Sequence, residues 1–81
     1  MDKYKDSQMV ILEGLESIRK EGGFLERKSA LKALQELRSN VFDLSFEDVH
    51  EKAWKLEKQL CKDTNNEWDD DANMCKIKED R

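Results

Sequence analysis

Apolar side chains recur every three or four residues along three stretches of this sequence, and this spacing restricts the chain to amphipathic helices. A helix repeats every ~3.6 residues, so side chains at that spacing gather on one face, where they can be buried. The stretches cover residues 2–20, 24–39 and 45–61. The chain has no proline and only 3 glycines, which favours helices over sheet or disorder. We therefore predict an all-α fold, a small three-helix bundle.

The first predicted helix, residues 2–20, carries more apolar side chains than one buried face requires. Its expected buried face consists of Tyr4, Ile11, Leu12, Leu15 and Ile18. Met9 and Val10 fall outside that face, so the helix is apolar over more than half of its circumference. We therefore expect this helix to be central in the fold or to contact a second chain.

Glycine and asparagine mark the predicted ends of the first two helices. Gly22 and Gly23 follow the first helix, and glycine readily takes the left-handed conformation that closes a helix. The second helix, residues 24–39, is expected to bury Ala30, Leu34, Leu37 and Val41, flanked by Phe24 and Leu31. Asn40 follows it and also tolerates positive φ, so we expect this residue to terminate the helix.

The third predicted helix, residues 45–61, begins with a capping signal. Ser45 can cap the first turn and Asp48 can return a hydrogen bond, as in a capping box. Apolar side chains then follow at three- and four-residue steps: Phe46, Val49, Ala53, Leu56 and Leu60. This seam predicts a helix that packs along both of the others.

The helical pattern ends at Lys62, and the remaining segment is acidic. Of the 19 acidic and 15 basic side chains, 7 acidic and 4 basic ones lie in residues 62–81, which leaves residues 1–61 nearly neutral. Residues 63–71 are rich in turn-forming residues, and the last seven residues, "CKIKEDR", are too few to form a helix alone. We expect one domain, a helical bundle at 1–61, with a C-terminal acidic arm at 62–81 that is flexible or folded back.

Neither a membrane segment nor a secretory leader is predicted. No apolar run approaches the ~20 residues needed to cross a bilayer, and "MDKYKDSQ" lacks the apolar core of a signal peptide. The expected location is therefore cytoplasmic, where Cys61 and Cys75 would be reduced thiols. A single disulfide is the alternative if the protein is exported.

The sequence predicts no metal site, no cofactor and no catalytic site. The single histidine and the two cysteines lack the close spacing of zinc ligands. Asp69, Asp71 and Asn73 match the first positions of an EF-hand-like calcium loop, but Met74 occupies the position that requires glycine. Cys75 has three aspartates nearby, which disfavour the reactive thiolate. We therefore expect a protein that is not an enzyme.

The two tryptophans are the expected anchors for a partner. Trp54 lies at the border of the apolar face of the third helix, where it either covers the core or contacts a partner. Trp68 lies in the acidic arm beside Asp69, Asp70 and Asp71. It either folds back onto the bundle or docks into a partner, with the aspartates meeting a basic patch.

The leading functional hypothesis is a small non-enzymatic protein-binding module. Inhibitors, immunity-type proteins, adaptors and anti-activators of phage or plasmid type fit this composition. The expected partner is another protein with a basic patch. Met9 and Val10 on the first helix, together with the arm from Trp68 to Asp71, are the candidate contact residues.

Two alternatives remain open. The first is a self-associating structural component, a homodimer that buries Met9, Val10 and Trp54. The second is a small transcriptional regulator that contacts DNA. Binding to nucleic acid is not expected, because the helix at 45–61 is acidic at its start and has no arginine for reading bases.

Overall fold

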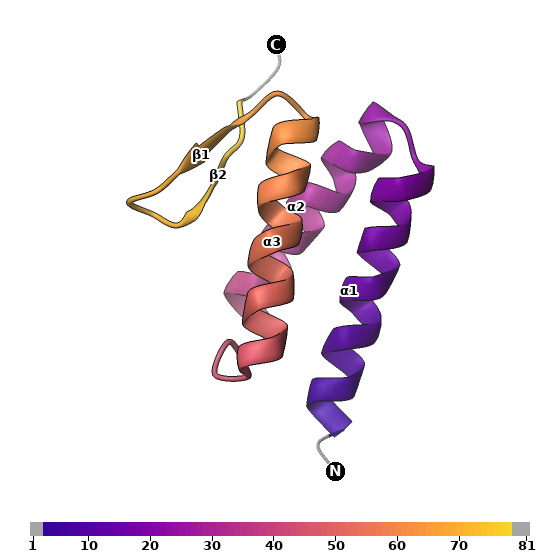
Figure 1. Cartoon of the computed structure of the whole chain (residues 1–81), viewed down its shortest axis with the longest axis vertical. Helices are drawn as coiled ribbons and strands as arrows, with labels where there is room; N and C mark the ends of the chain where they lie inside the picture. Colours follow the sequence, from indigo (N-terminus) through magenta and orange to yellow (C-terminus); the bar gives the residue numbers. More distant parts are fainter. Residues whose placement is uncertain (1–2, 79–81) are drawn as a thin grey trace.

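A computed structural model describes residues 3–78 as three helices followed by a short hairpin. The elements are α1 (Lys3–Glu21), α2 (Phe24–Asn40), α3 (Glu47–Asp63), β1 (Glu67–Asp69) and β2 (Met74–Lys76). All three helices pack against one another, which confirms the predicted all-α bundle. The hairpin contacts α3 and lies on the side of that helix away from α1 (Figure 1).

The core lies where the three helices meet, and α2 and α3 supply most of it. Its buried apolar residues are Leu12, Leu15, Ala30, Leu31, Leu34, Phe42, Val49, Ala53, Leu56, Leu60, Cys61 and Cys75. The predicted seam of α3 is therefore largely confirmed, since four of its five members are buried. Phe46 is the fifth, and it packs at the edge of the core.

The buried face of α1 is rotated from the predicted one. Ile11 and Ile18 are exposed, and Gln8 is buried in their place; the side chain of Tyr4 lies outside the described residues. Gln8 accepts a hydrogen bond from the Asp43 amide at 3.0 Å. Polar anchoring of this kind opposes a rotation that would bury the isoleucines, because Gln8 would lose its partner.

The opposite end of α1 is held by Arg19. Its Nε lies 2.7 Å from the Asp63 carboxylate at the end of α3, and its carbonyl accepts a hydrogen bond from Arg27 Nε on α2. Both neighbouring helices are therefore tied to α1 through one polar residue. Periodicity analysis of apolar residues does not register such contacts, which explains the wrong prediction for Ile11 and Ile18.

The turn between α1 and α2 needs glycine for close approach, not for a left-handed backbone. No glycine in the described chain has positive φ, so the predicted left-handed closure is wrong. A Cβ on Gly22 would lie 2.7 Å from both the Ile18 carbonyl oxygen and Glu26 Cβ. Gly23 has φ −87° and ψ −164° and precedes the first turn of α2.

The predicted cap of α3 is also wrong, although the helix itself is confirmed. Phe46 occupies the N-cap position, and no side chain caps the first turn. Ser45 turns back instead, donating its amide and hydroxyl to Asp43 Oδ1 at 3.0 and 2.6 Å. These bonds hold the pKa of Asp43 below its usual value. Asp48, the other half of the predicted box, pairs with Lys5 at 2.8 Å.

Helix α2 ends at Asn40, as predicted, but by a different mechanism. The C-cap residue is Val41, which has φ −117° and donates its amide to the Leu37 carbonyl at 2.9 Å. Positive φ occurs instead at Asn65 and Asn73, on either side of β1. Asparagine thus supplies left-handed conformations in the hairpin region, where the backbone reverses.

The acidic arm is not a free segment over its described part. Strands β1 and β2 pair antiparallel, with Trp68 opposite Cys75. Cys75 forms a disulfide with Cys61 of α3, at a Cα–Cα distance of 5.6 Å. The expectation of reduced thiols is therefore wrong for this structure. Pairing of the strands and the covalent link together fold the arm back onto α3.

Replacing Gly22 with alanine should destabilise the protein by about 1–3 kcal/mol, because the new methyl group overlaps backbone and Cβ atoms that cannot simply move aside. Gly14 provides the matched control, since a Cβ there meets nothing within 4 Å. Gly14→Ala should stabilise by about 0.5–1 kcal/mol through helix propensity alone. Urea denaturation followed by circular dichroism measures both, and equal effects would contradict the packing account.

Reducing the disulfide should lower the free energy of unfolding by about 3 kcal/mol, the value expected for a closed loop of roughly 15 residues. Urea denaturation with and without a phosphine reductant, followed by tryptophan emission, measures the change. A Cys61→Ser/Cys75→Ser variant should be insensitive to the reductant. If the wild-type midpoint does not move on reduction, the link does not stabilise the fold.

Candidate interaction surfaces

A buried carboxylate fastens the hairpin to the helices. The side chain of Glu57 on α3 is 1% exposed and pairs with Arg38 of α2. Glu57 Oε2 also accepts a hydrogen bond from the Cys75 amide at 2.6 Å. Gln35 of α2 completes the cluster, donating to the Cys75 carbonyl at 2.6 Å and to Glu57 at 3.3 Å. One carboxylate therefore joins α2, α3 and β2.

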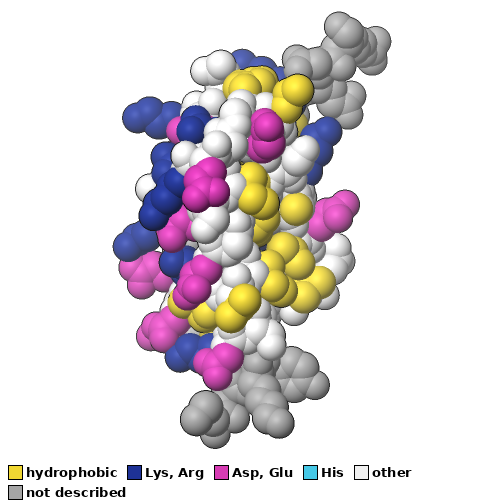
Figure 2. All heavy atoms as spheres, turned by 90° about the vertical axis from the view of Figure 1, so that its right-hand side faces the viewer, with side chains coloured by type: hydrophobic (Ala, Val, Ile, Leu, Met, Phe, Trp, Pro, Cys, Tyr) yellow, Lys and Arg dark blue, Asp and Glu magenta, His cyan; other side chains and the backbone are white. Residues whose placement is uncertain are grey.

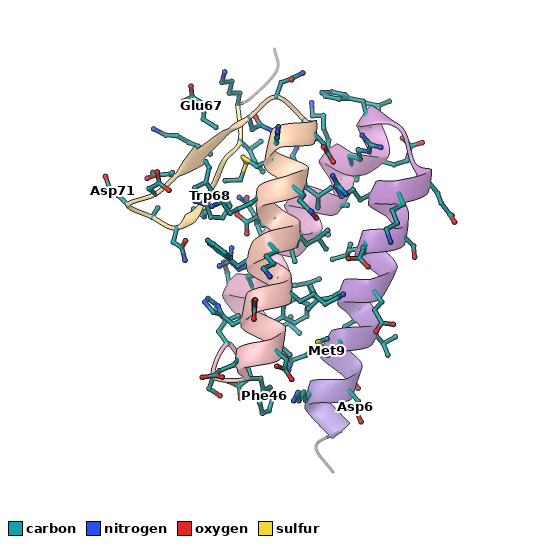
Figure 3. The ribbon with its side chains drawn as sticks, viewed as in Figure 1. Asp6, Met9, Phe46, Glu67, Trp68 and Asp71 are labelled. Atoms are coloured by element: carbon teal, nitrogen blue, oxygen red, sulfur yellow. A yellow bond between two sulfur atoms is a disulfide. The ribbon has the colours of Figure 1, made fainter. Side chains whose placement is uncertain are left out.

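The two tryptophans meet between α3 and the hairpin. The rings of Trp54 and Trp68 lie edge to face, with centroids 6.4 Å apart. Trp54 Nε1 donates to Asn73 Oδ1 at 2.8 Å, and Lys58 Nζ lies 4.4 Å from the Trp54 ring and 5.4 Å from the Trp68 ring. Figure 3 places Trp68 between the hairpin and α3. Both rings are half-buried, and their contact attaches the hairpin to α3.

The three aspartates form the tip of the hairpin. Asp69 Oδ1 accepts hydrogen bonds from the amides of Asp71 and Ala72 at 3.0 and 3.1 Å, which stabilises the turn. Asp70 and Asp71 are exposed, and Asp71 points away from the helices (Figure 3). Over residues 3–78, no group of three or more His, Cys, Asp or Glu side chains could hold a metal ion.

Exposed aliphatic side chains lie on the outer side of α1. Val10 is 66% exposed, Ile11 38% and Ile18 42%; we name these three residues the outer α1 ridge. Gly14 lies between Ile11 and Ile18, with open space where a Cβ would be. Figure 2 shows hydrophobic side chains running along this face beside charged ones. Two further apolar residues, Phe24 and Leu25, are exposed at the adjoining turn.

Charges beside the ridge are mainly negative. Asp6 and Glu13, seven residues apart, lie on one flank of the helix, and Glu21 lies at its end. Lys20, also on this flank, is 4.0 Å from Glu16. An apolar strip with an acidic border is therefore the most extended unpartnered feature of α1.

The structure does not bring the predicted contact residues onto one surface. Met9 is half-buried against the core, whereas its neighbour Val10 is exposed on the ridge. The rings of Trp54 and Trp68 contact each other where the hairpin packs on α3, and the hairpin lies on the other side of α3 from α1 (Figure 1). Asp70 and Asp71 occupy the hairpin tip. These residues therefore belong to two separate regions.

Sequence reasoning missed two features of these regions. Ile11 and Ile18 were assigned to the core, although their seven-residue spacing around Gly14 is also compatible with an exposed ridge. The cluster around Glu57 was missed because Glu57 reads as an ordinary surface residue of α3. Its only signal in the sequence is its position next to Leu56, between the seam residues Ala53 and Leu60.

No helix within residues 3–78 has the length and apolar character needed to cross a membrane. No protein-family model matches the chain, and searches of curated proteins and of solved structures found no significant match. Function must therefore be argued from the surfaces of the molecule.

Glu57→Gln should lower the free energy of unfolding by about 3–5 kcal/mol, because Arg38 is left buried without a counter-charge. Glu51→Gln is the matched control: this carboxylate lies on the same helix, is exposed and pairs only with Lys55 across one turn. Its loss should cost less than about 1 kcal/mol. Amide exchange at Cys75 in the Glu57 variant should also be faster, and unchanged exchange would contradict the proposed anchoring role.

Proposed function

We propose that this protein is a small non-enzymatic protein-binding module, of the inhibitor, immunity-type, adaptor or anti-activator kind, which acts through the outer α1 ridge. The observation that carries this proposal is the exposure of Val10, Ile11 and Ile18 on a helix that already buries Leu12 and Leu15 in the bundle. Neighbouring apolar side chains that stay exposed are typical of a contact surface.

The partner should offer an apolar strip or groove with basic residues at its border. Each half-exposed aliphatic side chain contributes roughly 1–2 kcal/mol when it is fully covered. The absence of a side chain at Gly14 lets a partner approach the helix backbone closely at the centre of the ridge. Asp6, Glu13 and Glu21 then favour a border of lysine or arginine, which matches the basic patch expected from the sequence.

A homodimer through the same ridge is the second candidate. It is favoured by the heptad spacing of Ile11 and Ile18, which suits packing of one α1 against another. Met9 and Trp54, the other residues expected in such an interface, contact their own chain instead. The acidic flank would also face its own copy, which disfavours a symmetric pair relative to a basic partner.

DNA binding receives little support from the lysines of α3. Lys52 lies 3.7 Å from Glu16 of α1, and Lys55 lies 2.8 Å from Glu51. Contacts with phosphates would have to compete with these interactions, and the chain carries a net charge of −4.

The proposal can be tested with a photoreactive amino acid placed at Ile18, and at the exposed α2 residue Glu36 as the control. We expect one host protein to be cross-linked from position 18 and not from position 36. The purified protein captured in this way should bind an Ile11→Ser/Ile18→Ser variant about tenfold or more weakly, since two covered aliphatic side chains are lost. Binding that is unaffected by this double substitution would rule out the ridge.

Sedimentation equilibrium at micromolar concentration separates the two candidates. The proposal expects a monomer, with the serine variant unchanged. A stable dimer that dissociates in the Ile11→Ser/Ile18→Ser variant would instead establish the homodimer.

A further inference from the structure

A second surface lies on the far side of the molecule, where the C-terminal end of α3 meets the hairpin. It is an open groove of about 730 Å³. We name it the basic groove, after Lys58, Lys62 and Lys78, which line it together with Trp68. It is separated from the outer α1 ridge by the width of the bundle, since α1 and the hairpin lie on opposite sides of α3 (Figure 1).

The fold brings these lysines together from distant parts of the sequence. Lys58 and Lys62 are one turn apart on α3. Lys78 follows β2, and its amide donates to Asn66 Oδ1 at 2.8 Å, which returns the end of the hairpin to the end of the helix. Asn66 is itself fixed by Thr64 Oγ1, at 2.8 Å from its side-chain nitrogen. Specific hydrogen bonds therefore hold Lys78 close to the end of α3, where Lys58 and Lys62 lie.

Among the described residues, the lysines that line the basic groove outnumber its acidic side chains by three to one. Within residues 3–78, none of its three lysines forms an ion pair, and Glu67 is the only acidic residue that lines it. The groove between α1 and α3 is different. It also contains two lysines, but Lys52 and Lys55 there are each paired with a glutamate. The chain as a whole carries a net charge of −4, so the local charge of this groove is opposite in sign to that of the molecule.

The floor of the basic groove suits a carboxylate-bearing chain. Trp68 is half-buried and offers part of its ring, while Lys58 is already held above the two indoles. The carbonyls of Leu60, Cys61 and Lys62 at the end of α3 accept bonds from the amides of residues 64–66. Because these backbone acceptors are occupied, the charged groups that remain for a ligand are the three lysines and Glu67.

We propose that the basic groove binds a short acidic peptide segment of a partner protein. Small-molecule sites are usually pockets that enclose their ligand. This groove is open and runs along the end of a helix and a strand, so it fits an extended peptide better than a small molecule. A long polyanion such as nucleic acid would be repelled by Asp70 and Asp71 at the tip of the same hairpin. This site is independent of the α1 ridge, and with both surfaces the protein could connect two partners, as an adaptor does.

The test uses a fluorescein-labelled ten-residue peptide of glutamates with one central leucine, and the same peptide with lysines in place of the glutamates. Fluorescence anisotropy at low ionic strength should show binding of the acidic peptide alone, with quenching of tryptophan emission. Lys62→Glu should weaken binding by about fivefold or more, since a favourable charge becomes a repulsive one. Lys32→Glu, an equal charge change on the exposed side of α2, should have less than about a twofold effect.

Several outcomes would overturn this inference. One is equally weakened peptide binding in the Lys62→Glu and Lys32→Glu variants, which would show that binding depends only on the net charge of the protein. Another is absence of binding at millimolar peptide, and a third is tighter binding of a single-stranded oligonucleotide of the same length, which would assign the groove to nucleic acid. Circular dichroism of each variant excludes unfolding as the cause. An Ile11→Ser/Ile18→Ser variant should bind the peptide normally, so this test does not depend on the function proposed for the ridge.

Discussion

The buried Glu57 carboxylate is the interaction on which the C-terminal half of the structure depends. A desolvated charge is tolerated only where its partners are fixed, and here Arg38, Gln35 and the Cys75 amide all converge on it. The same group therefore sets the position of α2 against α3 and of the hairpin against both. The disulfide and the paired tryptophans then hold an arrangement that this carboxylate defines.

This anchoring leaves one candidate surface on each side of α3. With the hairpin secured, Trp54 and Trp68 serve internal packing, and the lysines at the end of α3 are left facing solvent around them. On the other side, polar contacts of Gln8 and Arg19 fix the rotation of α1 and leave its isoleucines outside. Both candidate surfaces are thus consequences of where buried polar groups find partners.

The helices could be predicted from the sequence because their signals are local. The predicted stretch 45–61 corresponds to α3 (Glu47–Asp63), and four of its five seam residues are buried, because on this helix the buried face follows the apolar spacing. The exposure of Ile11 could not be predicted in this way, because it depends on a bond between Gln8 and a loop 35 residues away.

The hairpin could not be predicted from the sequence, for a similar reason. Each of its strands has only three residues, too few for a detectable alternation, and its attachment comes from Glu57 and Cys61 on another element. The expected compartment predicts reduced thiols, whereas Cys61 and Cys75 form a disulfide because the hairpin brings them within bonding distance. Long-range polar and covalent contacts therefore account for most of what the sequence pattern missed.

The modest apolar anchoring of α1 has a consequence for dynamics. Among the residues whose burial the structure describes, this helix supplies Leu12 and Leu15 to the twelve buried apolar residues of the core. The other ten come from α2, α3, the hairpin and Phe42 in the loop before α3, and a disulfide also links α3 to the hairpin. Sub-global opening should therefore begin with release of α1, ahead of the rest of the bundle. A ligand bound to the exposed face of α1 would suppress that opening. Its binding would therefore slow conformational fluctuations throughout the domain.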